Sequence, residues 1–597
     1  MKGAIGDWLI IPAGEHPPLQ GRDRASWEAV HHTPSATLWV TYPSTNWQGW
    51  PFASFETPQY KGWICGELWP GGVSSLAEVF ERPDQARHLN GYFIGIAVDK
   101  KNAQWQVITS RFGLVHAYYS LNDRRIGSYY PVVAYGADDL DWEGITAFFQ
   151  MGFFHGHHTY FQGVSILPMA TRNIFSPNLD ECQSQRYWHW EHHPDLRLSF
   201  PRAVEAFGEV FHQVINDAVW EGRIGLPISG GLDSRSTVVP ISQPSQYNRL
   251  KDRIWSYSYG YTDDSIETRI SREIADAVGL PFQAFTIRPY LFDQAERVFE
   301  WTEGFQDITQ CRQAFVRDEL AQHTDVLVGG LWGDVWHDEM GFLHHPPTGN
   351  DELAVEVLKK MSKRGYRWLV KHVVRPNVDM LPTEPLLHHI HVKLTTLQHI
   401  RDVDFRVKAY KTEEWSFRWS IPPIRVFQSG TLPKLVFYDT RLTDFFQAVP
   451  TQYLSGRRLQ IEYIKRFSPE LARIPWQVYG VNLYWYRYFN SWLLPLRAWR
   501  KLVRILRRQC IVQRNWEVQL LFSERERNHL RDWLLDPALP LHHYVERRET
   551  EKLVDQFLSL NAPDGAIGYT VSMLLTFSMW LELVAQKIRG KSSSGGT

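Results

Sequence analysis

The segment LPISGGLDSRS, residues 226–236, combines residue types that can bind a phosphate group. Two adjacent glycines, Gly230 and Gly231, let the backbone bend tightly and expose its N–H groups to an anion. Ser229 and Ser234 add hydroxyl donors, and a helix that follows would direct its positive end at the same point. The sequence therefore predicts a phosphate loop from Ser229 to Ser234.

Asp233 lies inside this loop and would repel a bare phosphate. Its presence makes sense if Mg²⁺ lies between the carboxylate and the phosphate oxygens. The loop lacks the GxxxxGK[ST] spacing of a Walker A motif, so transfer of a γ-phosphate is not the first expectation. The competing interpretation is an ordinary turn followed by a helix N-cap. A strand before the loop and helical residues after it favour the binding loop.

The elements around the loop indicate how it is positioned. A short apolar strand is predicted at 224–228, directly before the loop, and helical spacing of apolar residues precedes it at 202–221. Further short strands are predicted at 254–259 and 326–328, with helices between them. This alternation indicates a parallel sheet covered by helices.

The first 195 residues have a different pattern, with short β-branched and aromatic runs that end at turn-forming residues. Strands are predicted at 38–42, 93–98 and 105–110, and a helix is predicted at Trp142–Met151. Residues 187–201 are rich in His and Pro and are interpreted as a linker. We therefore expect a two-domain α/β chain with the divisions 1–195, 196–480, a mostly helical 481–590 that completes the second domain, and a disordered tail at 591–597.

The composition is that of a soluble globular protein of 597 residues, 44% hydrophobic and 22% charged, with a formal net charge of −1. Balanced charge gives no reason to expect a nucleic-acid partner. Four cysteines without metal-ligand spacing are too few for a disulfide scaffold and favour a cytoplasmic location. The N-terminus lacks the apolar run of a signal peptide. The apolar stretch at 569–584 contains Glu582, is short for a membrane span, and is interpreted as a buried helix.

The loop sequence SGGLDS resembles the SGGxDS loop of the pyrophosphate-loop ATPases. Within that group, most of the chain resembles the asparagine synthetase superfamily, which includes β-lactam synthetase, carbapenam synthetase and the lasso-peptide cyclases. The resemblance implies that ATP is cleaved to AMP and pyrophosphate, that a carboxylate is activated as an acyl-adenylate, and that an amine attacks it to form an amide. ATP and Mg²⁺ are the implied cofactors.

Other segments carry the resemblance in the same order along the chain. Residues 254–261 resemble the strand whose backbone would meet the adenine, and 437–450 resemble the Phe-Leu-Asp segment with its helix. Residues 328–341 resemble the Gly-rich segment, in which Asp334 would be the second Mg²⁺ ligand beside Asp233. The residues implied to bind the nucleotide and the metal are Ile228, Ser229, Gly230, Gly231, Leu232, Asp233, Ser234, Ser256, Tyr257, Gly330, Gly333 and Asp334.

Residues 89–119 and 145–168 resemble the amidotransferase-type αββα domain that precedes the synthetase domain. Members that hydrolyse glutamine need a cysteine directly after the initiator Met, but position 2 is Lys2 and the first cysteine is Cys65. An ammonium group cannot supply a thiolate nucleophile. We therefore expect this domain to lack glutaminase activity and to pack against the synthetase domain or shape an acceptor tunnel.

Two departures from the superfamily lie closer to the chemistry. Val335 stands where a Glu usually follows the second aspartate, and the Lys that neutralises pyrophosphate is missing from 471–480. A cation is needed because negative charge accumulates on the leaving pyrophosphate. Arg473, Lys465 and Arg466 are the cations available nearby, and the last two are the candidates for this role. These departures argue against plain asparagine synthesis.

Two further features of the sequence each allow more than one interpretation. The histidines at 155–158, 344–345 and 388–391 have no Cys or carboxylate at ligand spacing, so they are interpreted as loop or surface residues rather than zinc ligands. The stretch from Trp492 to Arg508 reads as a basic amphipathic helix that could contact an anionic membrane or a protein partner. Its alternative is a partly buried helix with a solvated basic face.

Together these observations predict an ATP-dependent carbon–nitrogen ligase that joins a small-molecule or peptide carboxylate to an amine. A lasso-peptide-type macrocyclase would be one specific enzyme of this kind. Ligases of natural product or polysaccharide biosynthesis would be others. The non-enzymatic alternative is a degenerate homologue that binds nucleotide without turnover. Another adenylating branch of the pyrophosphate-loop enzymes is disfavoured by the amidotransferase-like first half.

Overall fold

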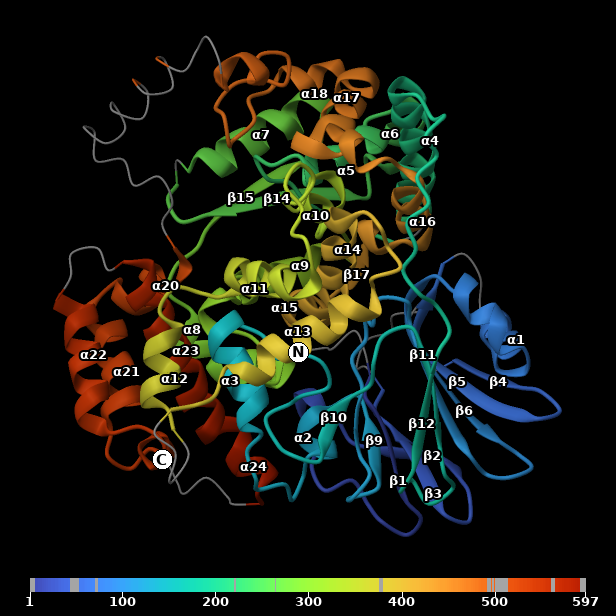
Figure 1. Ribbon diagram of the computed structural model, residues 1–597, viewed down its shortest axis with the longest axis vertical. Helices are drawn as coiled ribbons and strands as arrows, with labels where there is room; N and C mark the ends of the chain where they lie inside the picture. The colour runs from blue at the N-terminus through green and yellow to red at the C-terminus, as the bar shows by residue number, and fades with distance from the viewer. Residues whose placement is uncertain are drawn as a thin grey trace.

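The computed structural model describes residues 6–42, 53–69, 73–219, 222–263, 265–374, 380–490, 514–559 and 564–590, together with Pro495 and Trp499. Two antiparallel sheets come from the N-terminal part and a parallel sheet follows, with helices around both (Figure 1). This is the mixed α/β architecture that the sequence predicts. Lys2, the tail at 591–597 and nearly all of the basic stretch from Trp492 to Arg508 lie outside the described residues.

Both antiparallel sheets have six strands and are formed by the first 186 residues. The first sheet has the order β10 (Val164–Ile166), β8 (Tyr118–Ser120), β9 (Arg125–Gly127), β1 (Trp8–Pro12), β3 (Ala36–Val40) and β2 (Glu28–His32). The second has the order β12 (Cys182–Arg186), β11 (Thr171–Phe175), β7 (Trp105–Thr109), β6 (Gly91–Asp99), β5 (Tyr60–Leu68) and β4 (Ala53–Glu56).

Side chains that alternate along these strands form three apolar layers. Trp8 and Ile94 lie in the layer between the two sheets. Helix α1 (Val73–Glu81) covers the outer face of the second sheet. Helices α2 (Tyr130–Val133) and α3 (Trp142–Met151) share a buried cluster with the outer face of the first sheet. The order helix, sheet, sheet, helix agrees with the predicted αββα sandwich.

The parallel sheet has five strands in the order β15-β14-β13-β16-β17, and each neighbouring pair is parallel. Its predicted strands are confirmed to within two residues. The strands are β13 (Ile224–Pro227), β14 (Ile254–Gly260), β15 (Phe282–Thr286), β16 (Val326–Gly329) and β17 (Leu432–Leu435). The helices that share its buried core include α4 (Phe200–Ala218), α5 (Asp233–Ile241), α7 (Ile266–Val278), α9 (Gln313–His323) and α17 (Arg458–Phe467).

The strand order creates a switch point at β13. From β13 the chain continues to β14 and β15 on one side, then crosses to β16 and β17 on the other. The loops that leave neighbouring strands in opposite directions open a crevice at the carboxyl ends, which is where open α/β sheets bind ligands. The phosphate loop follows β13 and therefore lies in that crevice.

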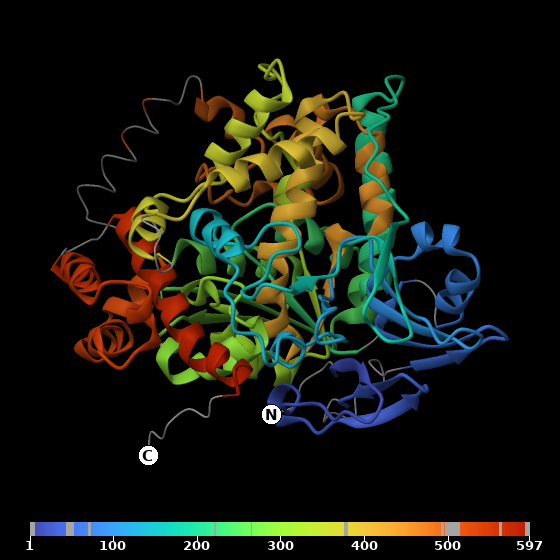
Figure 2. The same cartoon turned by 60° about the horizontal axis from the view of Figure 1, so that its bottom comes forward.

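The C-terminal residues form a helical bundle beside α3 (Figure 1 and Figure 2). Phe577 of the bundle contacts Phe149 of α3, and the Trp580 ring stacks on Tyr160 with centroids 3.7 Å apart. The bundle therefore packs on the N-terminal part as well as completing the second half. Its main helices are α20 (Asn515–Leu521), α21 (Glu524–Leu535), α22 (Arg547–Ser559) and α23 (Gly565–Trp580).

Among the described residues, one helical run is long and apolar enough to cross a membrane. This run, Gly565–Ile588, has a mean hydropathy of 1.4 in its most apolar window, and 78% of that window is buried inside the structure. Such burial is typical of a core helix. The interpretation of residues 569–584 as a buried helix is confirmed.

A buried ion-pair cluster joins the two halves at Glu303. Arg22 from the N-terminal part donates to Glu303 Oε1 at 2.5 Å, and Arg425 pairs with the other carboxylate oxygen. The Tyr118 hydroxyl also donates to Glu303, at 2.7 Å. Burial raises the pKa of Glu303, but the two guanidinium groups outweigh it and lower that pKa overall. Glu303 is therefore a buried carboxylate anion held by both halves.

Candidate functional site

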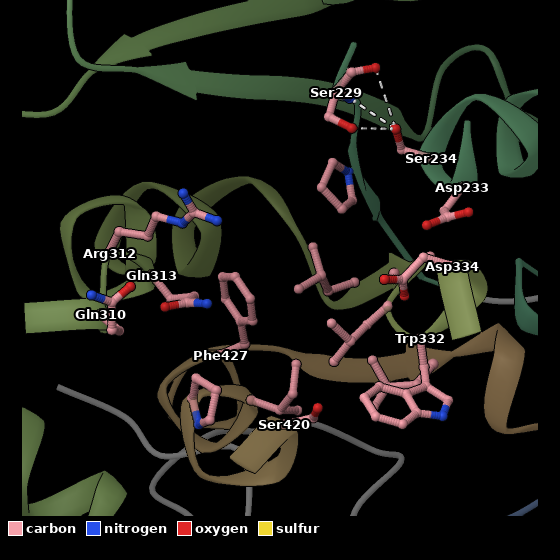
Figure 3. Close-up of a pocket in the computed structure, with 18 of the residues that line it drawn as sticks. Ser229, Asp233, Ser234, Gln310, Arg312, Gln313, Trp332, Asp334, Ser420 and Phe427 are labelled. Atoms are coloured by element: carbon pink, nitrogen blue, oxygen red, sulfur yellow. Dashed lines mark hydrogen bonds between the residues drawn. The ribbon is translucent and has the colours of Figure 1, made fainter. Parts of the chain in front are cut away.

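The phosphate loop turns at the carboxyl end of β13 and leads directly into α5 (Figure 3). Ile228 N donates to Tyr257 O at 2.8 Å, which ties the start of the loop to β14. The Ser234 hydroxyl accepts from Ser229 N at 2.9 Å and lies 2.8 Å from Ser229 Oγ. Gly231 N donates to Ser229 Oγ at 3.3 Å. The hydroxyls and amide hydrogens thus gather at the N-terminus of α5, where the helix favours an anion.

The loop after β16 passes close against the phosphate loop. A Cβ atom on Gly333 would lie 2.8 Å from the carboxyl carbon of Asp233, and one on Gly330 would lie 3.1 Å from the Asp233 carbonyl carbon. Trp332, between these glycines, has φ 75°, a left-handed conformation that is strained for a bulky residue. Strain of this kind clusters at functional sites. Here it accompanies the placement of Asp334 near Asp233 (Figure 3).

Asp233 has an electrostatic environment suited to a cation. Its side chain is 22% exposed, and burial raises its pKa to about 6, with Arg457 acting to lower that pKa and Asp334 to raise it. Asp233 Oδ1 accepts from the Gln460 amide at 2.9 Å. Two carboxylates from adjacent strand ends form an oxygen donor set of the kind that Mg²⁺ prefers. The residues present therefore fit a magnesium ion, which would relieve the repulsion between them.

Arg457 is a cation of this site that sequence reasoning missed. It precedes α17, has φ 59°, and its NH1 lies 3.1 Å from Asp233 Oδ1. Its Nε lies 3.9 Å from Asp338 Oδ2. The sequence signal for Arg457 is its position directly before the helix that packs on α5, because a side chain at a helix start can reach a neighbouring loop. The cations predicted from the sequence, Lys465 and Arg466, lie near the end of that helix instead.

The two cations predicted for this role lie elsewhere. Lys465 Nζ pairs with Glu462 at 2.9 Å on the same helix, and Arg466 pairs with Glu205 on α4. None of Arg457, Lys465 and Arg466 is part of the cavity lining, but Arg457 alone of the three pairs with Asp233. Lys465 and Arg466 both lie near the end of α17, whereas Asp233 contacts its beginning. Their positions do not support the predicted catalytic role, and Arg457 takes their place as the candidate.

A cavity of about 610 Å³ lies beside these groups, within the size range of small-molecule sites. One end contains the phosphate loop, Asp233 and Asp334, and the other end contains Gln310, Arg312 and Gln313 (Figure 3). Aromatic and apolar side chains line the space between the two ends. The cavity can therefore hold an elongated ligand with an anionic end and a second polar end.

Lys411 is a second cation that sequence reasoning missed. It lines the cavity, and its Nζ lies 4.7 Å from the ring centroid of Trp415 and 6.0 Å from that of Trp332. Burial lowers the pKa of Lys411, while the charge of Asp334 acts to raise it. Trp415 belongs to η4 (Thr412–Ser420), a π-helical turn that follows α14 (Val403–Lys411). Turns of this type often occur at functional sites.

The other predicted nucleotide ligands divide into two groups. Tyr257 lines the cavity, together with Ile228 and Gly330. Ser256 is fully buried, and its hydroxyl donates to the carbonyl oxygen of Pro281, which directly precedes the neighbouring strand β15. The cavity lining includes Tyr257, Ser258 and Tyr259 of β14 but not Ser256. Of the remaining ligands, the cavity lining includes Ser229, Asp233, Ser234 and Asp334, whereas Gly230, Gly231, Leu232 and Gly333 contribute backbone next to it.

The structure corrects the interpretation of the histidines at 155–158 as loop or surface residues without a carboxylate partner. His155 is fully buried, and Glu143 lies near both His155 and His158. Twelve to fifteen residues separate Glu143 from these histidines, and the turn after α3 brings them back to the start of that helix. By contrast, His344 and His345 are exposed, as expected.

No family model matches the chain, and no curated protein matches it. Among solved structures, glutamine phosphoribosylpyrophosphate amidotransferase from B. subtilis, complexed with ADP and GMP, is 10% identical with a TM-score of 0.19, over 60% of this chain and 73% of its own. A structure described as the allosteric regulatory enzyme of purine biosynthesis is also 10% identical, with a TM-score of 0.21, over 48% of this chain and 84% of its own. Likeness this slight carries no argument about function, so the function is argued from the site alone.

Proposed function

We propose that this chain binds ATP and Mg²⁺ in the cavity beside the phosphate loop and uses them to adenylate a carboxylic acid for attack by an amine. The observation that carries the proposal is the convergence of the loop, the Asp233–Asp334 pair and Arg457 at the switch point of a parallel sheet. Donors for phosphate, carboxylates for a divalent cation and a charge-neutralising cation are the groups that pyrophosphate departure needs.

The reaction would proceed in two balanced steps. An oxygen of the substrate carboxylate attacks the α-phosphorus, the bond from that phosphorus to the bridging oxygen breaks, and pyrophosphate leaves with the electron pair. The amine nitrogen then attacks the acyl carbon, AMP leaves, and the nitrogen releases its proton to solvent. Mg²⁺ would supply Lewis-acid stabilisation of the phosphate oxygens. Asp233 and Asp334 would hold it.

The protein groups have separate tasks in this scheme. The Ser229 and Ser234 hydroxyls and the amide hydrogens of the phosphate loop would bind the pyrophosphate oxygens. Arg457, whose NH1 lies 3.1 Å from Asp233 Oδ1, would offset negative charge on the pyrophosphate. Lys411 is a lysine in the cavity lining, beside Trp415, and could replace the pyrophosphate-binding Lys that is missing from 471–480. Preorganised charge of this type stabilises a transition state without reorganisation.

The amine would not come from glutamine hydrolysed by this chain. The structure describes three cysteines, all without disulfide bonds. Burial raises the pKa of Cys65 to about 12, and it also raises the pKa of Cys182 and of Cys311. Thiols of this kind stay protonated at neutral pH and are poor nucleophiles. Free ammonia or an amino group of a second substrate is the proposed donor.

A second candidate is nucleotide binding without turnover, and one observation favours it. Val335 is buried and lines the cavity where the resemblance implies a carboxylate. A site without that carboxylate could bind ATP and still fail to activate an acid.

ATP–pyrophosphate exchange in the presence of a panel of carboxylic acids tests the proposal. The wild-type chain should exchange labelled pyrophosphate into ATP with at least one acid, and Asp233→Asn should abolish the exchange. Lys465→Ala is the matched control, because Lys465 pairs with Glu462 outside the cavity. Calorimetry with ATP and Mg²⁺ separates the two candidates. ATP binding without exchange supports the non-catalytic alternative, and the absence of ATP binding rejects both.

A further inference from the structure

A cluster of three side chains in the N-terminal half has the composition of a transition-metal site. Glu143, His155 and His158 each offer one ligand atom, and these atoms all lie within 4.8 Å of one another. Glu143 Oε1 lies 3.4 Å from His158 Nε2 and 3.8 Å from His155 Nε2. We refer to these three residues as the His155 cluster. The cluster lies outside the cavity proposed to bind ATP.

His155 is the observation that points to a ligand. Its ring is fully buried, and neither nitrogen has a hydrogen-bond partner among the described residues. Leaving a buried polar group unpaired costs about 1–3 kcal/mol, so such groups normally have an explanation. A metal ion bound to one of the two ring nitrogens would supply such a partner.

His158 is oriented as metal-binding histidines are. Its Nδ1 lies 2.6 Å from Asp141 Oδ2, and the same aspartate caps α3 by accepting from Gly144 N at 3.1 Å. Nδ1–H would donate a hydrogen bond to this carboxylate, which leaves Nε2 unprotonated with its lone pair toward Glu143. Histidine ligands of metals usually donate their other N–H to a carboxylate in this way.

The backbone holds this arrangement tightly. A Cβ atom on Gly144 would lie 2.9 Å from His158 Cβ, so the histidine loop packs directly on the first turn of α3. On the other side, the His389 ring of α13 (Glu384–Thr396) contacts the His155 ring with centroids 4.4 Å apart. Arg418 of η4 donates to His158 O at 2.6 Å. The second half of the chain therefore closes over the cluster.

Two of the three distances between ligand atoms are close to those around a tetrahedral ion. With metal–ligand bonds of about 2.0–2.1 Å, the edges of a tetrahedron are about 3.3–3.4 Å. The separations of Glu143 Oε1 from the two histidine nitrogens, 3.4 and 3.8 Å, lie at or slightly above this edge. Two imidazoles with one carboxylate suit zinc and its first-row neighbours, whereas Mg²⁺ and Ca²⁺ prefer oxygen ligands alone.

We propose that Glu143, His155 and His158 form a binding site for one Zn²⁺-type divalent cation. Three protein ligands leave a fourth position, and the Glu143 side chain is 44% exposed, so water can complete the shell from that side. The ion would connect the first turn of α3 to the loop that contacts α13 and η4. It would therefore stabilise the contact between the two halves, independently of any reaction in the ATP cavity.

The test uses the full chain, stripped with a chelator and then titrated with Co²⁺ or Zn²⁺ in the presence of excess Mg²⁺ and without ATP. The wild type should bind one equivalent, show the visible absorption of tetrahedral Co²⁺, and gain thermal stability with Zn²⁺. Glu143→Gln keeps the shape of a partly exposed side chain and should weaken binding at least about tenfold, and Asp141→Asn should weaken it by about 10–100-fold. His158→Gln should remove the cobalt spectrum.

A double variant, His344→Gln with His345→Gln, is the matched control because both side chains are exposed and lie in another loop. It should bind the metal like the wild type. The proposal is overturned if the wild type holds no stoichiometric metal after gel filtration. It is also overturned if Glu143→Gln and His158→Gln bind Co²⁺ with wild-type affinity and spectrum. Circular dichroism of each variant separates loss of the site from loss of the fold.

Discussion

The two halves of this chain differ in the surroundings of their charged side chains, which are paired with each other in one half and line a cavity in the other. In the N-terminal half, the buried charges of Asp7 and Arg22 pair with each other, and Arg22 also pairs with Glu303 from the second half. In the parallel-sheet half, Asp334 and Lys411 face an open cavity instead. Charges that are fully paired stabilise a contact, whereas charges held beside a cavity remain available to a ligand.

This difference indicates which half has the features of a reactive site. The antiparallel sandwich has a buried thiol at Cys65, whose pKa is raised by burial, and the buried ion pair of Asp7 and Arg22, which are features that suit a structural role. The parallel sheet places strand ends, a helix N-terminus and paired carboxylates at one edge. The His155 cluster differs, because neither nitrogen of the buried His155 ring has a hydrogen-bond partner within the described residues.

The largest effect is expected at the carboxylate pair. Asp233→Asn should reduce ATP–pyrophosphate exchange to background, a loss of at least about 10³-fold, because several kcal/mol of metal-assisted charge stabilisation are removed. Exchange is measured with labelled pyrophosphate at saturating acid. If Asp233→Asn keeps an exchange rate within tenfold of the wild type, the proposal that the parallel-sheet half holds the active site is contradicted.

The second effect concerns the charge cluster between the halves. Glu303→Gln leaves the Arg22 and Arg425 guanidiniums without their shared anion and should destabilise the fold by about 3–5 kcal/mol. Urea unfolding measures the change. Glu549→Gln is the control, because that glutamate forms a surface pair with Lys552 and should leave the midpoint unchanged. Equal midpoints for the two variants would contradict the scaffold role of Glu303.

A third, smaller effect is expected at Arg457. Arg457→Gln should lower exchange by about 10²-fold, since one preorganised cation near the departing pyrophosphate is lost. Arg466→Gln should leave exchange unchanged, because Arg466 pairs with Glu205 away from the cavity. If Arg466→Gln lowers exchange more than Arg457→Gln does, Arg466, the cation predicted from the sequence, is supported instead of Arg457.

The smallest effect is expected at the buried thiol. Cys65→Ala should change neither exchange nor the use of ammonia, and glutamine should yield no glutamate with either protein, because a thiol with a pKa of about 12 supplies almost no thiolate. Glutamate release is measured by a coupled assay. Glutaminase activity that disappears in Cys65→Ala would show that the sandwich half is catalytic after all.

Local patterns predicted local structure well. The helix at Trp142–Met151 is confirmed residue for residue, and the strand before the phosphate loop ends one residue earlier than predicted. Both have strong signals within a few residues, an N-cap aspartate in one case and an apolar run before a Gly-rich turn in the other. The phosphate loop and Asp233 were predictable for the same reason, because strand ends are identifiable in sequence, whereas Asp334 was predicted from the resemblance to the superfamily.

Residues that act across long sequence distances were not predicted. Arg457 meets Asp233 across 224 residues, and Lys411 reaches the cavity from the last residue of α14, directly before a π-helical turn that no propensity signals. Ligand spacing along the chain does not identify Glu143 as a partner of His155 and His158, which lie 12 and 15 residues after it. Spacing detects ligands that share one element, and it fails when a turn returns the chain to an earlier helix.

The amino-acid sequence by itself determined the elements, the α/β class and the phosphate loop, because each depends on neighbouring residues. Tertiary structure alone decided which cations face the loop, which of Ser256 and Tyr257 lines the cavity, and that Glu143 meets His155 and His158. The physical reason is that strand order and helix packing set distances between side chains far apart in the chain, and those distances decide charge and ligand chemistry.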